Sequence, residues 1–305
     1  PGGLTPEMNA EIANQIQKAS DYISLHMGAY WRFHKLIAPS DDPLGLEMKA
    51  NNQITPLLTK PVMVTGRIMT LDHASALISS GEADMVSMVR ALIADPNLVN
   101  KARAGAEEKI RPCIGSNMGC VGQLMTTGRL GCVVNSAAGR ERTTLFDVQE
   151  KADIKKKILV VGGGPAGLEF ARTAALRGHQ VELHDAMGRL GGQVLMASSA
   201  PHRADLGAIT DWLANELDSL GVEVHLNSLV DEELVAKLLA PHRPKSVKHI
   251  HATEDGQSIR LILRGYLPPV IEAQQENDQM RIEDKREGPD FYSHVSKEIY
   301  KYSKT

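Results

Sequence analysis

A run of glycines directly after an apolar strand constrains the fold of this chain more than any other feature. The strand is predicted over Lys157–Val161, and Gly162, Gly164 and Gly167 follow it in the spacing Gly-x-Gly-x-x-Gly. Gly162 permits a tight turn, Gly164 lets a pyrophosphate approach the backbone, and Gly167 allows the next helix to pack closely on the sheet. The pattern therefore predicts a Rossmann-like βαβ unit that binds a dinucleotide.

The residues after these glycines support the same prediction. A helix is expected from Pro165 and Ala166 to about Leu176, so that its positively polarised N-terminus faces the phosphates. A second strand follows over Val181–Asp185, and Asp185 lies about twenty residues beyond the glycines, where an acid that binds a ribose hydroxyl is expected. Loop glycines without a ligand are the alternative, but strand, glycines, helix, strand and acid in register favour the binding site.

Three cysteines precede this unit and indicate a second cofactor site. They are Cys113, Cys120 and Cys132, and an odd number of cysteines in a reducing compartment favours metal ligation or buried thiols over disulfides. Cysteine thiolates, normally four of them, hold iron–sulfur clusters. Zinc is a weaker alternative, because the spacing lacks two Cys-x-x-Cys pairs and no histidine stands at a ligand-like interval.

The N-terminal part of the chain alternates short apolar strands with helical stretches, which is typical of a parallel α/β protein. Strands are expected at residues 21–25, 61–65 and 84–88, and helices at 6–18, 47–58, 73–80 and 97–104. Arg67 and Arg90 follow the second and third strands, at the face where such proteins bind ligands. Together with Gly66 they are expected to hold one phosphate; solvated or salt-bridged loop arginines are the alternative.

Composition excludes some classes of partner. The net charge of −3 provides no basic field for nucleic acid or an anionic membrane, and the aromatic content of 4% provides no stacking platform for bases. No apolar run approaches the ~20 residues that span a bilayer, and the N-terminus carries no signal peptide. We therefore expect a cytoplasmic protein with a small-molecule substrate.

In their order along the chain, these motifs resemble those of a known family. Three segments, Val64–Ile68, Gly81–Val86 and Arg90–Pro96, are similar to the last three βα units of the old-yellow-enzyme type of TIM barrel. The segments Arg111–Cys120 and Cys132–Asn135 are similar to the iron–sulfur segment of the long members, such as bacterial 2,4-dienoyl-CoA reductase and trimethylamine dehydrogenase. The resemblance covers about residues 15–240.

The resemblance implies an α/β fold in which the C-terminal portion of a TIM (β/α)8 barrel is followed by a Rossmann-like FAD-binding βαβ domain. The implied domains are a partial FMN-binding barrel at 1–106, an iron–sulfur segment and linker at 107–150, an FAD-binding domain at 151–240, and a divergent tail at 241–305 whose composition favours disorder in part. A complete barrel takes roughly 250 residues, so five of its eight βα units are absent. The open barrel edge predicts a homo-oligomer that covers it.

The implied cofactors are FMN, FAD and an iron–sulfur cluster. Gly66, Arg67 and Arg90 would hold the FMN phosphate, and His34, in a loop over the flavin, is a weak candidate for substrate contact, with a plain loop histidine as the alternative. Residues 188–193 resemble the second FAD-contacting loop of this group, which favours FAD over NAD. The implied FAD-binding residues are Gly162, Gly164, Pro165, Ala166, Gly167, Asp185, Gly192 and Gln193.

The cysteine motif departs from the family pattern, because Ser116 stands where the family has cysteine. Cys113, Cys120 and Cys132 would support a 3Fe-4S cluster, or a 4Fe-4S cluster whose remaining iron takes the Ser116 oxygen or water. Such an oxygen ligand makes a more labile site. An empty site with three buried thiols is the alternative.

The function implied by the resemblance is that of a flavin-dependent oxidoreductase. Electrons would pass between flavins, cluster and an enoyl-CoA-like or amine-like substrate, with NAD(P)H as a further partner, and the chain would be an incomplete member. Two alternatives remain: an FAD-binding electron-transfer module of a larger complex, and an inactive truncated fragment. The two substrate classes are not separable, because the residues that choose between them lie in the missing strands.

Overall fold

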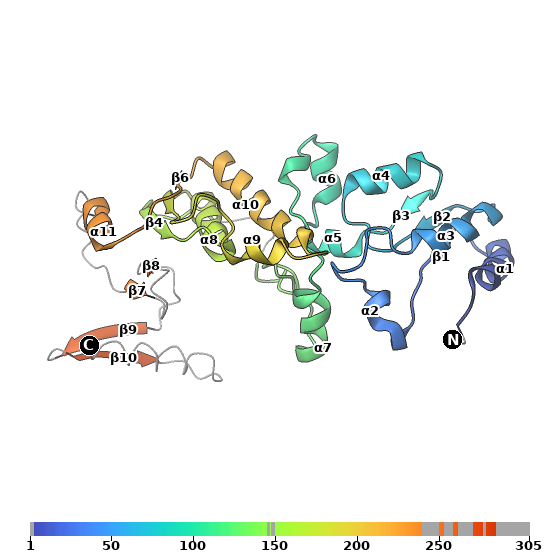
Figure 1. The fold of residues 1–305 in the computed structure, drawn as a ribbon, viewed down its shortest axis with the longest axis horizontal. Helices are drawn as coiled ribbons and strands as arrows, with labels where there is room; N and C mark the ends of the chain where they lie inside the picture. Colours follow the sequence, from blue (N-terminus) through green and yellow to red (C-terminus); the bar gives the residue numbers. More distant parts are fainter. Residues whose placement is uncertain are drawn as a thin grey trace.

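The chain folds into two α/β units that lie side by side along its long axis (Figure 1). A computed structural model describes residues 3–144, 147, 150–239, 250–252, 259–261, 271–276 and 279–284. We call residues 3–111 the N-terminal unit and residues 150–239 the C-terminal unit; the cysteine segment lies between them in the sequence. No helix in this described part is both long and apolar enough to cross a membrane.

The N-terminal unit is built on a parallel sheet. The strands β1 (Ile23–Leu25), β2 (Val62–Val64) and β3 (Met85–Val86) pair in the order β1-β2-β3. Because all strands run the same way, their carboxyl ends meet at one edge, as predicted from the alternating pattern. The helices of this unit are α1 (Pro6–Ile16), α2 (Phe33–Leu36), α3 (Met48–Ile54), α4 (Leu71–Ser79), α5 (Val89–Ala94) and α6 (Leu98–Arg103).

Helix α4 shows how local sequence sets the ends of these elements. The Thr70 side chain accepts a hydrogen bond from the His73 N–H (3.2 Å), which caps the start of the helix. At the other end, the N–H of Glu82 donates to the Leu77 carbonyl (3.0 Å) around Gly81. Glycine is the usual residue just past a helix end, and the predicted stop at Gly81 is confirmed.

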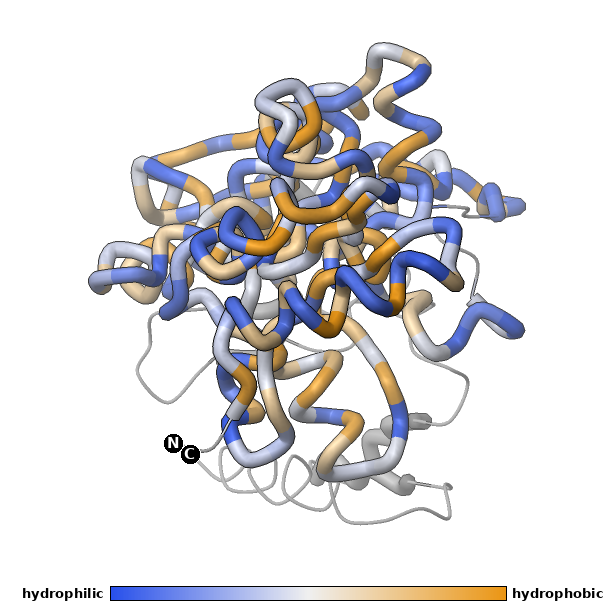
Figure 2. The backbone as a smooth tube through the Cα atoms, turned by 90° about the vertical axis from the view of Figure 1, so that its right-hand side faces the viewer, coloured by the Kyte–Doolittle hydropathy of each residue, from blue (hydrophilic) through white to orange (hydrophobic). Residues whose placement is uncertain are grey.

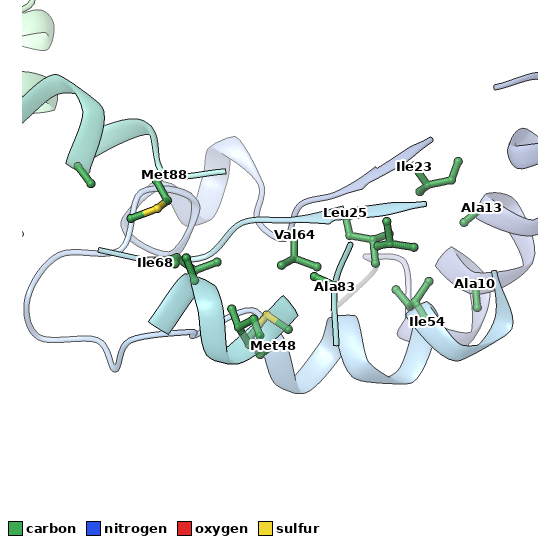
Figure 3. Close-up of a cluster of buried hydrophobic side chains, with 14 of the residues drawn as sticks. Ala10, Ala13, Ile23, Leu25, Met48, Ile54, Val64, Ile68, Ala83 and Met88 are labelled. Atoms are coloured by element: carbon green, nitrogen blue, oxygen red, sulfur yellow. The ribbon is translucent and has the colours of Figure 1, made fainter. Parts of the chain in front are cut away.

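A continuous apolar core holds the N-terminal sheet to its helices (Figure 3). Val62 and Val64 of the central strand are 2% and 0% exposed, and side chains of α1, α3 and α4 cover them. Hydrophobic and hydrophilic residues alternate along the helices (Figure 2), as helices with one buried face require. The labelled core residues are Ala10, Ala13, Ile23, Leu25, Met48, Ile54, Val64, Ile68, Ala83 and Met88.

The C-terminal unit carries the predicted strand–glycine loop–helix–strand order. Its strands β4 (Lys157–Val161), β5 (Gln180–His184) and β6 (Glu223–His225) form a parallel sheet in the order β4-β5-β6. The helices are α8 (Pro165–Leu176), α9 (Gln193–Ser198), α10 (Ala208–Ser219) and α11 (Glu232–Leu239), with a 3-10 turn, η6 (Ala204–Gly207), before α10. The predicted bounds of β4 and α8 are confirmed, and β5 starts one residue before the predicted strand.

Between the units, the cysteine segment forms a single π-helical turn, Met118–Gly122, followed by α7 (Gln123–Thr127). Beyond α11 the structure describes two antiparallel strand pairs, β7 (Ile250–Ala252) with β8 (Ile259–Leu261), and β9 (Ile271–Glu276) with β10 (Gln279–Asp284). Part of the tail at 241–305 therefore takes up strand structure. The disorder expected for the rest of the tail concerns residues outside the described ones.

Candidate cofactor sites

The first glycine loop connects β4 to α8 in the geometry that the sequence predicts. Gly162 has a φ of +98°, a backbone conformation that residues with a side chain rarely adopt. Its N–H donates to the His184 carbonyl (2.8 Å). A Cβ atom on Gly167 would enter the Gly162 carbonyl, so only glycine lets α8 start this close to the strand. At Gly164, by contrast, the nearest heavy atom to an added Cβ is the Gly192 Cα at 4.0 Å. The space in front of the helix N-terminus is thus open at Gly164.

Asp185 lies at the end of β5 beside this loop, and its carboxylate stabilises the loop directly. The side chain is buried and accepts hydrogen bonds from the N–H of Gly163 and from the N–H of Met187 (2.7 Å). A carboxylate can accept about four hydrogen bonds, so these two leave capacity for a ribose hydroxyl. Asp185 therefore has a loop-bracing role in addition to the one predicted for it.

The second loop, residues 188–193, docks on the first. The Gly191 N–H donates to the Gly163 carbonyl (2.8 Å), and a Cβ atom on Gly192 would lie 3.0 Å from the Gly164 Cα. Gln193 then begins α9. The backbones of the two glycine loops are thus in direct contact. Together the loops line the approach to the N-terminus of α8.

The two strand-end arginines lie close to each other but contact different partners. Arg67 is buried, and its guanidinium forms an ion pair with Asp205 of the C-terminal unit, while its Nε atom is buried without a hydrogen-bond partner among the described groups. Arg90 lies in the first turn of α5 and donates to the Asn117 side chain (2.8 Å). A Cβ atom on Gly66 would lie 2.7 Å from the Glu47 Cβ, so the Glu47 side chain can pack at this position only because residue 66 is glycine.

The three cysteines lie near one another, with Arg90 beside Cys113 and Cys120 and Arg111 beside Cys132. Burial raises the pKa of the Cys113 thiol, and the Gly115 N–H and the charge of Arg90 act in the opposite direction. Burial likewise raises the pKa of Cys132, against hydrogen bonds from the N–H groups of Val134 and Asn135. Backbone N–H groups and a cation that favour thiolates are what a thiolate-ligated cluster requires.

Two further contacts fix the geometry of the cysteine segment. A Cβ atom on Gly119 would lie 2.5 Å from the Val133 N, which places the Cys120 turn directly against the backbone at Cys132 and Val133. The Asn117 side chain joins the segment to the N-terminal unit, because its Nδ2 donates to the Ile37 carbonyl (2.7 Å). Within the described residues, the ligand atoms of the three cysteines do not lie within 4.8 Å of one another, as ligands of a single zinc ion would.

A buried charge network joins the two units beside the cysteines. Arg111 donates to Asp147 (3.0 Å) and to Glu169 of α8 (3.2 Å), and Arg172 of α8 donates to the same Asp147 oxygen (2.8 Å). Both guanidinium groups lie over the Trp212 ring of α10, at 4.3 and 4.9 Å from its centroid. Burial disfavours ionisation of Asp147, but Arg172 and Arg111 outweigh it and hold the pKa of Asp147 below its ordinary value.

The predicted substrate loop lies exposed after β1. His34 is exposed on the short helix α2, and Trp31 is 80% exposed. A groove of about 700 Å³ lies beside this loop and is lined in part by Met27, Trp31 and Lys35. His34 is not part of the groove lining, and its contact with substrate stays a prediction.

Several residues at these sites were not found from the sequence. Asp205, Asn117 and Asp147 each pair with an arginine that is distant in the sequence, and no local pattern marks such partners. Glu47 is buried, and its carboxylate accepts from the Met27 N–H (2.7 Å) at the end of β1. Burial raises the pKa of Glu47, against the Met27 N–H and His26. In the sequence, the one feature that marks Glu47 is its position at the start of the predicted helix 47–58.

Comparison with known proteins identifies both units. Residues 6–109 match the NADH:flavin oxidoreductase / NADH oxidase family, and residues 135–260 match the pyridine nucleotide-disulphide oxidoreductase family. The second match extends beyond both ends of the FAD-binding domain predicted at 151–240. The three cysteines lie in residues 110–134, between the two family matches.

Relatives of known function and structure agree with these matches. An NADH oxidase of Thermoanaerobacter brockii is 40% identical over 240 residues, which is 78% of this chain and 36% of the relative. The structure of 2-naphthoyl-CoA reductase with 2-naphthoyl-CoA matches with a TM-score of 0.72 and 30% identity, over 77% of this chain and 36% of that one. Histamine dehydrogenase from Rhizobium sp. 4-9 matches with a TM-score of 0.69 and 26% identity, over 87% of this chain and 37% of that one.

The chain thus spans about a third of the length of the relatives that it matches. The order of the two matched families is the order in which the sequence motifs predicted them. This chain belongs to the old-yellow-enzyme and trimethylamine-dehydrogenase-like group, and it carries a segment of the NADH:flavin oxidoreductase / NADH oxidase family followed by a segment of the pyridine nucleotide-disulphide oxidoreductase family.

Proposed function

We propose that this chain is the electron-transfer part of a flavin-dependent oxidoreductase, with FMN at the N-terminal unit, FAD at the C-terminal unit and an iron–sulfur cluster between them. The observation that carries the proposal is the position of the cysteines. Cys113 and Cys132 pack against the core of the C-terminal unit, while Arg90 of the N-terminal unit interacts with Cys113 and Cys120. A group held there would lie between the two flavin sites.

The glycine loops fit FAD. Gly164 has open space in front of it, and the α8 N-terminus supplies the positive end of a helix dipole for a pyrophosphate. Gly162, Gly164, Pro165, Ala166 and Gly167 would form the phosphate loop. Asp185 would accept from the ribose, and Gly192 and Gln193 would close the site from the second loop. FAD bound there would supply one- and two-electron redox chemistry.

The end of the N-terminal sheet fits an FMN phosphate. Arg67 has a buried Nε without a partner among the described groups, and Arg90 uses one donor on Asn117, which leaves further donors in its fork. An arginine fork binds phosphate with paired hydrogen bonds. The first domain would then be the last three βα units of a TIM barrel and the second a Rossmann-like domain. A homo-oligomer or further chain would cover the open sheet edge.

The cysteine segment would hold the cluster through Cys113, Cys120 and Cys132, with Ser116 or water at the remaining iron. Ser116 is partly exposed, and among the described groups its Oγ accepts only a long hydrogen bond from the Met118 N–H (3.4 Å). Its oxygen is therefore free to turn toward iron. The hydrogen bonds from backbone N–H groups to Cys113 and Cys132 would favour the deprotonated ligands.

For the substrate, the names of the relatives support two classes. 2-Naphthoyl-CoA reductase and cinnamate reductase are named for unsaturated acyl compounds, while histamine and dimethylamine dehydrogenases are named for amines. We propose a small substrate of one of these classes, NAD(P)H as electron donor, and a cytoplasmic location suited to reduced thiols. The groove near Trp31 is the candidate binding surface.

Cofactor analysis of the purified chain tests this proposal. The chain would be isolated without oxygen, and its FMN, FAD and iron content would be measured for the native sequence, Gly164→Ala and Arg90→Gln. We expect the first variant to lose FAD and keep FMN, and the second to lose FMN and keep FAD. Loss of neither flavin from its variant would refute the assignment of these sites.

The same measurement separates the second candidate function, an FAD-binding module of a larger complex. That function is favoured by the completeness of the two glycine loops, which need nothing from the absent barrel strands. A chain that retains FAD and lacks FMN and iron would support the module. A chain without any cofactor would support the inactive fragment.

A further inference from the structure

Four metal-ligating side chains lie on one face of the C-terminal sheet, outside the cofactor sites described above, and the ligand atoms of three of them, Glu182, His184 and His225, lie within 4.8 Å of one another. In the register of β5 and β6, Glu182 lies opposite Glu223 and His184 lies opposite His225. Side chains two residues apart on a strand share a face, so all four belong to the same surface. The apolar residues Val181 and Leu183 point to the other face, into the core.

The distances between these groups are close to those of a metal site. The Nε2 of His225 lies 3.3 Å from the Glu182 carboxylate and 3.2 Å from the Glu223 carboxylate, and the Nε2 of His184 lies 2.8 Å from Glu182. Tetrahedral zinc with bonds of about 2.0–2.1 Å keeps its ligand atoms roughly 3.3 Å apart. Two of these separations already match, and the third needs to open by about 0.5 Å.

His225 carries an unused ligand atom. Its Nε2 is buried and makes no hydrogen bond with the described groups, although two carboxylates lie within 3.3 Å. The ring stacks on His184, with centroids 4.4 Å apart, which fixes its orientation. A buried imidazole nitrogen without a hydrogen bond, between carboxylate oxygens, is arranged to bind a cation.

His184 has the outer partner that metal-bound histidines usually have. Its Nδ1 lies 2.8 Å from the Ser228 hydroxyl, on the side opposite to the nitrogen that faces Glu182. A hydroxyl both donates and accepts, so Ser228 suits either neutral form of the ring. His184 can therefore hold its proton on Nδ1 and present Nε2 to a metal without gaining charge.

From this arrangement we propose that Glu182, His184 and His225 form a Zn²⁺ site, with the exposed Glu223 carboxylate turning in as the fourth ligand. A cation there also relieves the repulsion between Glu182 and Glu223, which are directly opposite on neighbouring strands. Two imidazoles and two carboxylates are a donor set that zinc accepts, whereas magnesium prefers oxygen ligands alone. The partial exposure of Glu182, His225 and Glu223 lets the ion enter from solvent.

The site would stabilise the short edge strand β6 next to the dinucleotide loop. The His225 carbonyl accepts from the Asp185 N–H (2.9 Å), and the Asp185 carbonyl accepts from the Ser228 N–H (2.9 Å). A metal that joins β5 to β6 would hold the backbone on both sides of Asp185. The proposal does not depend on which flavin the chain binds.

The test must separate this site from the cysteine thiols, which also bind zinc. The purified full chain would be treated with iodoacetamide to block the thiols, incubated with Zn²⁺ and desalted, and the retained metal would be measured. The variant is His225→Gln, whose side chain is 36% exposed and whose loss should leave the fold intact. The matched control is His202→Gln, an exposed histidine on the loop before η6.

We expect the native chain and His202→Gln to retain one equivalent of Zn²⁺ more than His225→Gln. Bound Co²⁺ should give a tetrahedral spectrum without thiolate charge transfer. At Zn²⁺ about 100-fold above its Kd, the melting temperature of the blocked native chain should rise by about 5–10 °C, with no rise in Mg²⁺. Equal retention by native chain and His225→Gln would overturn the proposal. If His225→Gln fails to fold, absence of the Zn²⁺-specific rise in the native chain would overturn it.

Discussion

Replacing Gly167 by alanine tests the physical basis of the first glycine loop. An added Cβ atom would overlap the Gly162 carbonyl oxygen and lie 3.1 Å from its carbon, with the Val160 side chain at 3.5 Å. The crowded atoms are backbone, so they cannot turn away as a side chain would. Overpacking of this kind costs about 3 kcal/mol at the upper end of the usual range, and the better helix propensity of alanine returns about 1 kcal/mol.

The expected net loss is about 2 kcal/mol in the free energy of unfolding, which lowers the melting temperature by roughly 4–8 °C. Thermal and urea unfolding of the flavin-free chain measure it. Gly164→Ala is the control, because its Cβ has no heavy atom closer than 4.0 Å and should leave the melting temperature unchanged. A Gly167→Ala chain as stable as the native one would refute the close-approach argument, whatever happens to flavin binding.

Three further predictions concern the charges and the cysteine segment. Arg172→Ala leaves the buried Glu216 without its guanidinium partner and Asp147 with Arg111 as its remaining one, and should cost about 3 kcal/mol in urea unfolding. Arg189→Ala, on an exposed ion pair, should cost less than about 1 kcal/mol. Arg172 and Arg111 lower the pKa of Asp147 in the folded chain, so the contribution of Asp147 to the free energy of unfolding should be complete above the ordinary carboxyl pKa of about 4. That contribution should be lost as the pH falls through the lower folded-state pKa. Asp147→Asn should therefore flatten this part of the curve of stability against pH. Ser116→Cys should raise the iron retained per chain, and unchanged iron content would argue against Ser116 as the weak ligand position.

The elements that the sequence predicted well are those whose cause is local. The strand β4, its glycine turn and helix α8 follow from a short apolar run, the glycine spacing and Pro165, all within twenty or so residues. Helix α5 was not predicted, because Arg90 was interpreted as the end of a strand and lies instead in the first helical turn. The strand at 84–88 was correspondingly too long, and only Met85–Val86 pairs with β2.

The candidate sites were predictable in residue type but not in partner. The cysteines and the strand-end arginines stand out in the sequence. The structure places Arg90 beside Cys113 and Cys120, a contact that the sequence did not predict. The pairing of Arg67 with Asp205 joins residues 138 positions apart, and the position of Asp147 depends on three separate elements. Contacts of this kind arise from tertiary packing, which no local pattern records.

The charge network around Trp212 has a consequence for how the molecule comes apart. Arg111 ends the N-terminal unit, and its buried guanidinium pairs with Glu169 and lies over the Trp212 ring of the C-terminal unit. Separating the units would strand charged groups in a newly exposed apolar surface. The chain should therefore melt in a single transition, and a protease that cuts between the units should yield halves that remain associated.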